Sequence, residues 1–147
     1  MAAIRRAEAT WSGALTTGSG TVSAISSGEF SELPVSWSAR TESSDGKTSP
    51  EELLAAAHAA CFSMALSGAL GRAGTPPDRL DVTAEVTFDK VEAGWRVVSS
   101  ALTVRGRVPG STEEAFKAAA ESTRDGCPIS AALAGNVALS VEATLEA

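Results

Sequence analysis

The chain has 147 residues, 44% of them hydrophobic and 20% charged, which is enough for one domain with its own hydrophobic core. Its formal net charge of -6 and the lack of any basic run argue against nucleic-acid binding, which needs a positive surface. No apolar segment follows Arg5 and Arg6 as in a signal peptide, and no stretch approaches the ~20 apolar residues of a membrane span, so we expect a cytoplasmic protein.

The first third of the chain predicts three strands. Residues 8–12 and 20–26 are typical of short strands, and a segment rich in Gly and Thr forms the turn between them. Residues 33–42 (LPVSWSARTE) alternate between apolar and polar side chains, which predicts a half-buried strand that carries Arg40. Residues 43–49 are expected to form a loop.

A long apolar helix is predicted to run from Ser49 to about Leu70. Ser49 is in position to be the N-cap, Pro50 takes the first helical position, and Glu52 can close a capping box. The helix is apolar on almost every face, and a domain of short strands offers little cover for such a helix. We therefore expect a homodimer in which the partner chain covers part of it.

Three more strands are predicted in the second half of the chain. Residues 78–91 and 94–108 alternate regularly and predict a β-hairpin, and residues 136–146 predict a final strand. The order of the main elements is then β-β-β-α-β-β-α-β. We predict a single α+β domain over residues 1–147, with the helices packed against an antiparallel sheet.

Two helices are predicted between the hairpin and the final strand. Residues 109–126 form the first, with Ser111 as N-cap and Glu114 closing its capping box. A short helix follows Cys127 and has Pro128 in its first position. Cys127 is therefore at an N-cap, where free backbone N–H groups and the helix dipole favour a thiolate.

The two cysteines, Cys61 and Cys127, could form a redox pair. One thiolate would reduce a peroxide and become a sulfenic acid, and the second thiol would condense with it to a disulfide. By helix position Cys127 is the better thiolate, because Cys61 lies deep in its own helix, where apolar surroundings raise the pKa of a thiol. The residues alone also allow two unrelated packing cysteines.

His58 lies one helical turn before Cys61 and has two interpretations. It could pair with a cysteine, or it could be an interior histidine whose hydrogen bonds are satisfied. One histidine and two cysteines with no fourth ligand at metal spacing do not predict a zinc site. We expect no metal and no cofactor.

The segment SPEELLAAAHAACFSMALS (residues 49–67), together with GCPIS (residues 126–130), resembles the OsmC (osmotically inducible protein C) family, which is related to the organic hydroperoxide resistance (Ohr) proteins. GWRVVSSALTV and the order of elements extend the resemblance over nearly the whole chain, and His58 is typical of the OsmC branch. The resemblance implies an intertwined homodimer. It also implies a haem-free thiol peroxidase in stress defence, acting on organic hydroperoxides and on hydrogen peroxide, with a lipoylated or thioredoxin-like dithiol protein as reductant.

By motif position, the resemblance makes Cys61 the peroxidatic cysteine and Cys127 the resolving one, the reverse of what helix position favours. Glu51 and Arg40 match the glutamate and the arginine of the family, so that Arg40 would stabilise the Cys61 thiolate and Glu51 would orient Arg40. Residues ten apart in one helix lie ~15 Å apart along its axis. We therefore expect the Glu51 that meets Arg40 beside a given Cys61 to come from the partner chain.

One alternative from a different class stays open. The chain could be a dimeric apolar-ligand-binding or structural stress protein whose cysteines are inert. Reaction of the thiols with a hydroperoxide distinguishes this alternative from the peroxidase.

Overall fold

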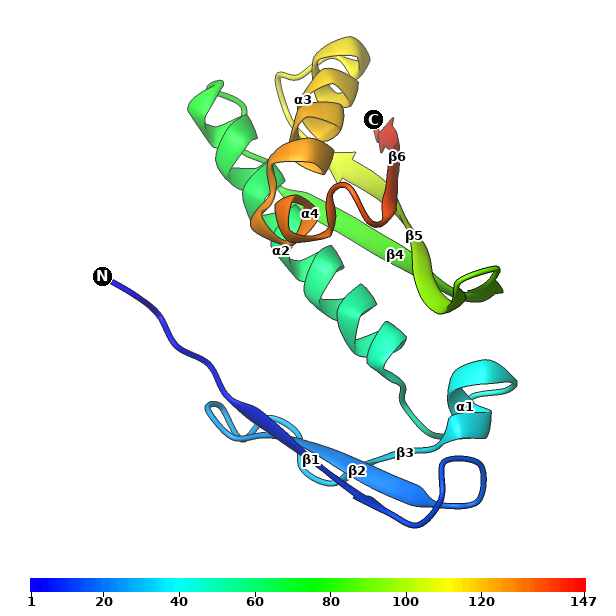
Figure 1. The fold of residues 1–147 in the computed structure, drawn as a ribbon. Helices are drawn as coiled ribbons and strands as arrows, with labels where there is room; N and C mark the ends of the chain where they lie inside the picture. The colour runs from blue at the N-terminus through cyan, green and yellow to red at the C-terminus, as the bar shows by residue number, and fades with distance from the viewer. The chain divides into compact units, whose positions relative to one another are not determined.

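The computed structural model describes all 147 residues, which divide into two compact units, residues 1–53 and 54–147 (Figure 1). Each unit contains one three-stranded sheet. The ten elements follow the order β1-β2-β3-α1-α2-β4-β5-α3-α4-β6, which confirms the predicted α+β order and adds one unpredicted helix, α1. That residues 1–147 form a single domain stays a prediction.

The first unit is built on an antiparallel sheet of β1 (Ala7–Ser12), β2 (Ser19–Ala24) and β3 (Leu33–Val35). Trp11 of β1 lies opposite Gly20 of β2. A Cβ atom at Gly20 would lie 2.7 Å from the Trp11 ring, so the close approach of this ring requires glycine.

Residues 37–41 form a short helix, α1 (Trp37–Thr41), so the predicted strand over residues 33–42 is right for β3 only. The Ser36 side chain caps α1 and accepts a hydrogen bond from the backbone N–H of Ala39 at 3.2 Å. This cap satisfies a free N–H group and favours a helical turn, although the side chains alternate as they do in a strand. Arg40 therefore lies in the last turn of a helix.

The predicted long helix is α2 (Pro50–Arg72), with Ser49 as its confirmed N-cap. The Ser49 hydroxyl accepts a hydrogen bond from the Glu52 backbone N–H at 3.1 Å. The predicted capping box is not closed as expected, because the Glu52 carboxylate instead accepts a hydrogen bond from the Thr48 hydroxyl at 2.7 Å. The cap fixes where the helix begins.

By length and composition α2 is apolar enough to cross a membrane, so the expectation that no stretch approaches a membrane span is wrong on this criterion. The core helix of a soluble protein meets the same criterion. One face of α2 is buried in the core of the second unit through His58, Phe62, Leu66 and Leu70. The side chains of Ala56, Ala57, Ala60, Met64 and Ser67 are exposed.

The second unit contains the long hairpin of β4 (Arg79–Val91) and β5 (Gly94–Arg107), with a bulge near its tip. The final strand, β6 (Ala138–Leu145), pairs with β5 in parallel, which corrects the prediction of a purely antiparallel sheet. The chain leaves the end of β5 and returns through α3 and α4 (Figure 1). β6 therefore starts opposite Ser99 and runs in the same direction as β5.

Two helices connect β5 to β6, namely α3 (Glu113–Gly126) and α4 (Pro128–Leu133). Thr112, and not the predicted Ser111, is the N-cap of α3, because its hydroxyl accepts the Ala115 N–H at 3.1 Å. Cys127 is the N-cap of α4, as predicted.

The core of the second unit is a cluster of buried side chains from α2, β5 and α3, among them Phe62, Leu66, Leu102, Val104 and Phe116. Phe116 of α3 packs directly over Gly106 of β5, where a Cβ atom would lie 2.5 Å from the ring. Because only glycine leaves room for this ring, Gly106 determines how closely α3 approaches the sheet.

Candidate active site

The two predicted redox cysteines lie together in the second unit and both are free thiols. Cys61, on α2, is partly exposed, and Cys127, between α3 and α4, has no exposed surface. Cys61 packs against the core cluster that contains Cys127, and the two thiols interact. Of the two cysteines, only Cys61 has exposed surface.

The surroundings of Cys61 raise the pKa of its thiol. Burial is the largest cause, and the neighbouring Cys127 adds to it, whereas a hydrogen bond from the Ile129 backbone N–H lowers the pKa. Ile129 is in the first turn of α4, so this helix supplies a donor that the position of Cys61 within α2 does not predict. The balance of these effects within the second unit favours the neutral Cys61 thiol.

Cys127 is held by Ser130 in two ways. The Ser130 backbone N–H donates to the Cys127 sulfur at 3.4 Å, which is the capping contact of α4. The Cys127 thiol donates to the Ser130 hydroxyl oxygen at 3.1 Å. The sulfur is therefore fixed in one orientation at the start of α4.

His58 is fully buried and both of its ring nitrogens have partners. Its Nδ1 lies 2.7 Å from the Ser100 Oγ, and its Nε2 lies 2.8 Å from the Ser130 Oγ. Burial lowers the pKa of His58, which keeps the ring neutral near pH 7. Of the two interpretations of His58 in the sequence, the structure supports an interior histidine with satisfied hydrogen bonds, and these bonds connect it to Cys127 through Ser130. No cluster of three His, Cys, Asp or Glu side chains is suited to hold a metal ion.

Arg40 and Glu51 form an ion pair within the first unit. The guanidinium donates to the Glu51 carboxylate from Nη2 at 2.8 Å and from Nε at 3.0 and 3.2 Å. The guanidinium also lies 6.0 Å from the centre of the Trp37 ring. Arg40 is paired with Glu51 of its own chain in a geometry that fixes the orientation of the guanidinium. That the Glu51 beside a given Cys61 comes from the partner chain stays a prediction.

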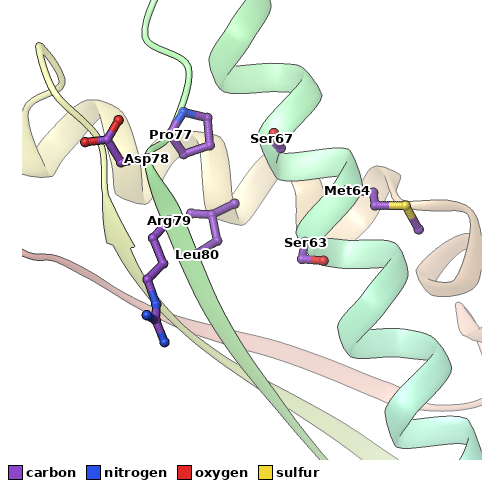
Figure 2. A pocket seen from close by; sticks show the side chains of 7 residues that line it. All are labelled: Ser63, Met64, Ser67, Pro77, Asp78, Arg79 and Leu80. Carbon is purple, nitrogen blue, oxygen red and sulfur yellow. The ribbon is translucent and has the colours of Figure 1, made fainter.

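Two hollows lie near these elements, one beside Arg40 in the first unit and one beside α2 in the second unit. A cavity of about 190 Å³ in the first unit is lined by Arg40 and by mostly apolar side chains, including Trp11, Leu15 and Trp37. An open groove of about 430 Å³ lies in the second unit between α2 and the start of β4. In Figure 2, Ser63 and Ser67 of α2 lie opposite Leu80 of β4, and Met64 lies on the side of α2 away from β4. Neither cysteine lines this groove.

The OsmC-like protein family model matches residues 43–142, which include α2, both cysteines and most of the second unit. The chain belongs to the OsmC family. The Escherichia coli protein named peroxiredoxin OsmC is 42% identical over 135 residues, covering 92% of this chain and 93% of its own. The Bacillus subtilis organic hydroperoxide resistance protein OhrA is 30% identical over 122 residues, covering 80% of this chain and 84% of its own.

The fold of this OsmC-family chain is also found in solved structures. The crystal structure of the organic hydroperoxide resistance protein OhrB of Bacillus subtilis aligns with a TM-score of 0.72 at 24% identity, covering 96% of this chain and 98% of that one. At this identity the match establishes the shared fold. The α+β architecture is therefore that of OsmC and Ohr proteins.

Proposed function

We propose that this OsmC-family protein is a thiol-dependent peroxidase that reduces organic hydroperoxides, and also hydrogen peroxide, in stress defence in the cytoplasm. The observation that carries the proposal is the partly exposed Cys61 in contact with the fully buried Cys127. Cys61 would meet the substrate, and Cys127 would supply the second sulfur from its contact with Cys61. The names of the two relatives, a peroxiredoxin and an organic hydroperoxide resistance protein, support this function.

The first step of the proposed reaction takes place at Cys61. Its thiolate attacks the outer oxygen of the hydroperoxide, the O–O bond breaks, and the sulfur becomes a sulfenic acid. The leaving alkoxide takes up a proton and departs as an alcohol, or as water from hydrogen peroxide. No haem, metal or other cofactor takes part.

The second step joins the two cysteines. Cys127 attacks the sulfenic sulfur of Cys61, a disulfide forms, and the hydroxyl group leaves as water. A small thiol or a dithiol protein, lipoylated or thioredoxin-like, then reduces the disulfide and restores both thiols. Residues 1–147 act together as one OsmC-like domain in this cycle.

Arg40 and Glu51 complete the proposed site in the assembled homodimer. The pKa of Cys61 is raised within the second unit, so its thiolate needs a cation from outside it. Arg40 of the second copy is that cation, and it also stabilises the charge that develops on the leaving oxygen. Glu51 holds the guanidinium in place from within its own chain. Glu51 and Cys61 are ten residues apart along α2, which argues against one chain supplying both the Arg40–Glu51 pair and the Cys61 of a single site.

The homodimer is supported by apolar surface that a single chain leaves uncovered. On α2, Met64 is 70% exposed in the middle of a row of small exposed residues. Few apolar side chains of the first unit are buried. Several of its large hydrophobic side chains are exposed, namely Ile4, Trp11, Leu15 and Ile25. Large exposed apolar side chains in both units are typical of an interface, and we propose that a second copy covers them.

A count of free thiols tests the function. One equivalent of cumene hydroperoxide per chain is expected to remove two thiols from the reduced protein, and Cys61→Ser is expected to lose none. Cys127→Ser is expected to form a sulfenic acid at Cys61 that does not proceed to an intramolecular disulfide. Unchanged thiols in all three proteins would favour the alternative of a binding or structural protein with inert cysteines.

A further inference from the structure

The structure connects His58 to Cys127 through a continuous row of buried side chains. The Cys127 sulfur lies 3.1 Å from the Ser130 Oγ, which lies 2.8 Å from the His58 Nε2, and the His58 Nδ1 lies 2.7 Å from the Ser100 Oγ. All four residues have no exposed surface. Resting on the proposed function, we propose that Ser130 and His58 form a proton relay that takes the thiol proton from Cys127 when it attacks the Cys61 sulfenic acid.

The need for a relay follows from burial. A thiol must lose its proton to become the attacking group in disulfide formation. The Cys127 sulfur is not exposed to bulk water, so its proton leaves through a protein group. The Ser130 hydroxyl is the side-chain oxygen to which the thiol already donates.

The direction of the hydrogen bonds in the row suits this transfer. The thiol donates to the Ser130 Oγ, so the Ser130 hydroxyl proton is available to the His58 Nε2, and the Nδ1–H is left to donate to the Ser100 Oγ. Burial keeps His58 neutral at rest, so its Nε2 is free to accept. Every donor in the row then points away from the sulfur.

Two linked proton shifts carry out the step. The thiol proton of Cys127 moves to the Ser130 Oγ while the Ser130 hydroxyl proton moves to the His58 Nε2. The result is a thiolate and an imidazolium bridged by the Ser130 hydroxyl, which now donates back to the sulfur. The thiolate displaces the hydroxyl group of the Cys61 sulfenic acid, and this group leaves as water when it receives the proton held by His58. No net proton is gained or lost, and no further reactant is needed.

The members of the row have different parts in this reaction. Ser130 contacts the reacting sulfur and is a catalytic residue. His58 acts through Ser130 and is a positioning residue that also stores the proton. Ser100 fixes the ring tautomer by accepting from Nδ1.

The test separates the two steps of the cycle. After rapid mixing with cumene hydroperoxide, dimedone labelling measures the sulfenic acid at Cys61, and loss of dimedone reactivity measures disulfide formation. In Ser130→Ala and His58→Gln we expect disulfide formation to slow by about a hundredfold or more, as for loss of general acid–base assistance. Formation of the sulfenic acid should stay within about twofold of the wild-type rate, because the relay does not act on that step.

Thr123→Val is the matched control. It removes a buried hydroxyl one helical turn before Cys127 that bonds only to the Ala119 carbonyl. We expect both of its steps to match the wild type. Unchanged disulfide formation in Ser130→Ala, or equal slowing of both steps in both relay variants, would overturn the relay. Failure of the wild type to form any sulfenic acid would instead overturn the proposed peroxidase.

A second measurement needs neither a variant nor a peroxide. His58 is the one histidine in the chain, so ¹⁵N spectra of the reduced protein report its ring alone. We expect Nδ1 to carry the proton and Nε2 to be bare, and we expect the ¹⁵N signal of Nε2 to move when Cys127 is oxidised with diamide. A ring protonated at Nε2 in the reduced protein at pH 7 would contradict the relay even if every variant failed to fold.

Discussion

Arg40 and Glu51, eleven residues apart, bind each other through three hydrogen bonds within one chain. Glu51 is 7% exposed, and the guanidinium of Arg40 reaches its carboxylate with both Nε and Nη2. A guanidinium held in this way keeps its remaining donors in a fixed direction. The carboxylate therefore holds the guanidinium as a preformed donor group.

The first prediction concerns this pair. Arg40→Lys keeps the charge but loses the two-point contact, so we expect oxidation of Cys61 by cumene hydroperoxide to slow about tenfold or more. Stopped-flow fluorescence of the three tryptophans measures the second-order rate constant. Glu51→Gln is expected to slow the same step, and the double variant to be little slower than either single one, because the two residues act as a unit.

Arg79→Lys is the control for this prediction. Arg79 and Asp81 form a pair of the same geometry, at 3.0 to 3.1 Å, on the surface of β4. We expect Arg79→Lys to oxidise at the wild-type rate. Equal rates of Cys61 oxidation in Arg40→Lys and Arg79→Lys would show that Arg40 is not part of the active site.

The second prediction concerns pH. Burial raises the pKa of the Cys61 thiol, so the second unit alone favours the protonated form, which does not attack peroxide. The rate of Cys61 alkylation by iodoacetamide is expected to rise with pH, and its midpoint should be higher in Arg40→Ala than in the wild type. Both are measured with Cys127→Ala as background. Identical midpoints would show that Arg40 does not act on the thiolate.

A linked effect on stability has a defined sign. The folded state binds the Cys61 proton more tightly than the unfolded state does. This contribution is fully present below the ordinary thiol pKa and is lost as the pH rises through the raised value. Urea denaturation of reduced Arg40→Ala/Cys127→Ala, in which burial acts on the Cys61 pKa without the proposed cation, should therefore give a lower free energy of unfolding as the pH rises through this range. The same protein with Cys61→Ser should show a smaller loss.

The third prediction concerns the homodimer. Ala60 is exposed on α2, and Ala60→Lys would place a charge in the surface that we propose the second copy covers. We expect sedimentation equilibrium to give the mass of one chain for this variant and of two chains for the wild type. Ala118→Lys makes the same change at an exposed alanine of α3 and should remain a dimer. A single-chain mass for the wild type at micromolar concentration would contradict the proposal.

The fourth prediction concerns Gly106. A methyl group there would meet the Phe116 ring at 2.5 to 2.6 Å, so we expect Gly106→Ala to lower the free energy of unfolding by about 1–3 kcal/mol, as for an overpacked core. Chemical denaturation monitored by circular dichroism measures the change. Gly126→Ala is the control, because a Cβ atom at Gly126 meets nothing within 4 Å. Gly106→Ala should unfold at clearly lower denaturant than this control.

Much of the fold could be predicted from local signals. The cap at Ser49 and the apolar run after it predict α2, and Pro128 predicts the start of α4. Helix α1 was missed because five residues are too few to show helical periodicity, and the alternation in SWSAR resembles a strand. A serine at residue 36, placed to cap a turn, is the one signal that could have revealed it.

The site was predictable only where a motif carried it. The residues alone indicate a possible redox pair of Cys61 and Cys127, whereas the roles of the two cysteines and the parts of Arg40 and Glu51 come from a resemblance. The structure adds the contacts of these side chains. The partners of His58 lie 42 and 72 residues away, at Ser100 and Ser130, so no local pattern connects them. The parallel pairing of β6 was also hidden, because alternation predicts a strand but not its neighbour.

The long separation of the two cysteines in the chain has a thermodynamic consequence. A Cys61–Cys127 disulfide would close a loop of 66 residues that contains the hairpin and α3. Restricting the unfolded chain over a loop of this length stabilises the fold by about 4 kcal/mol in the chain-entropy model. Each turnover would then take the second unit through a more stable disulfide form and a less stable dithiol form. The melting temperature of the protein would therefore report the fraction of chains in the disulfide form that have not yet been reduced.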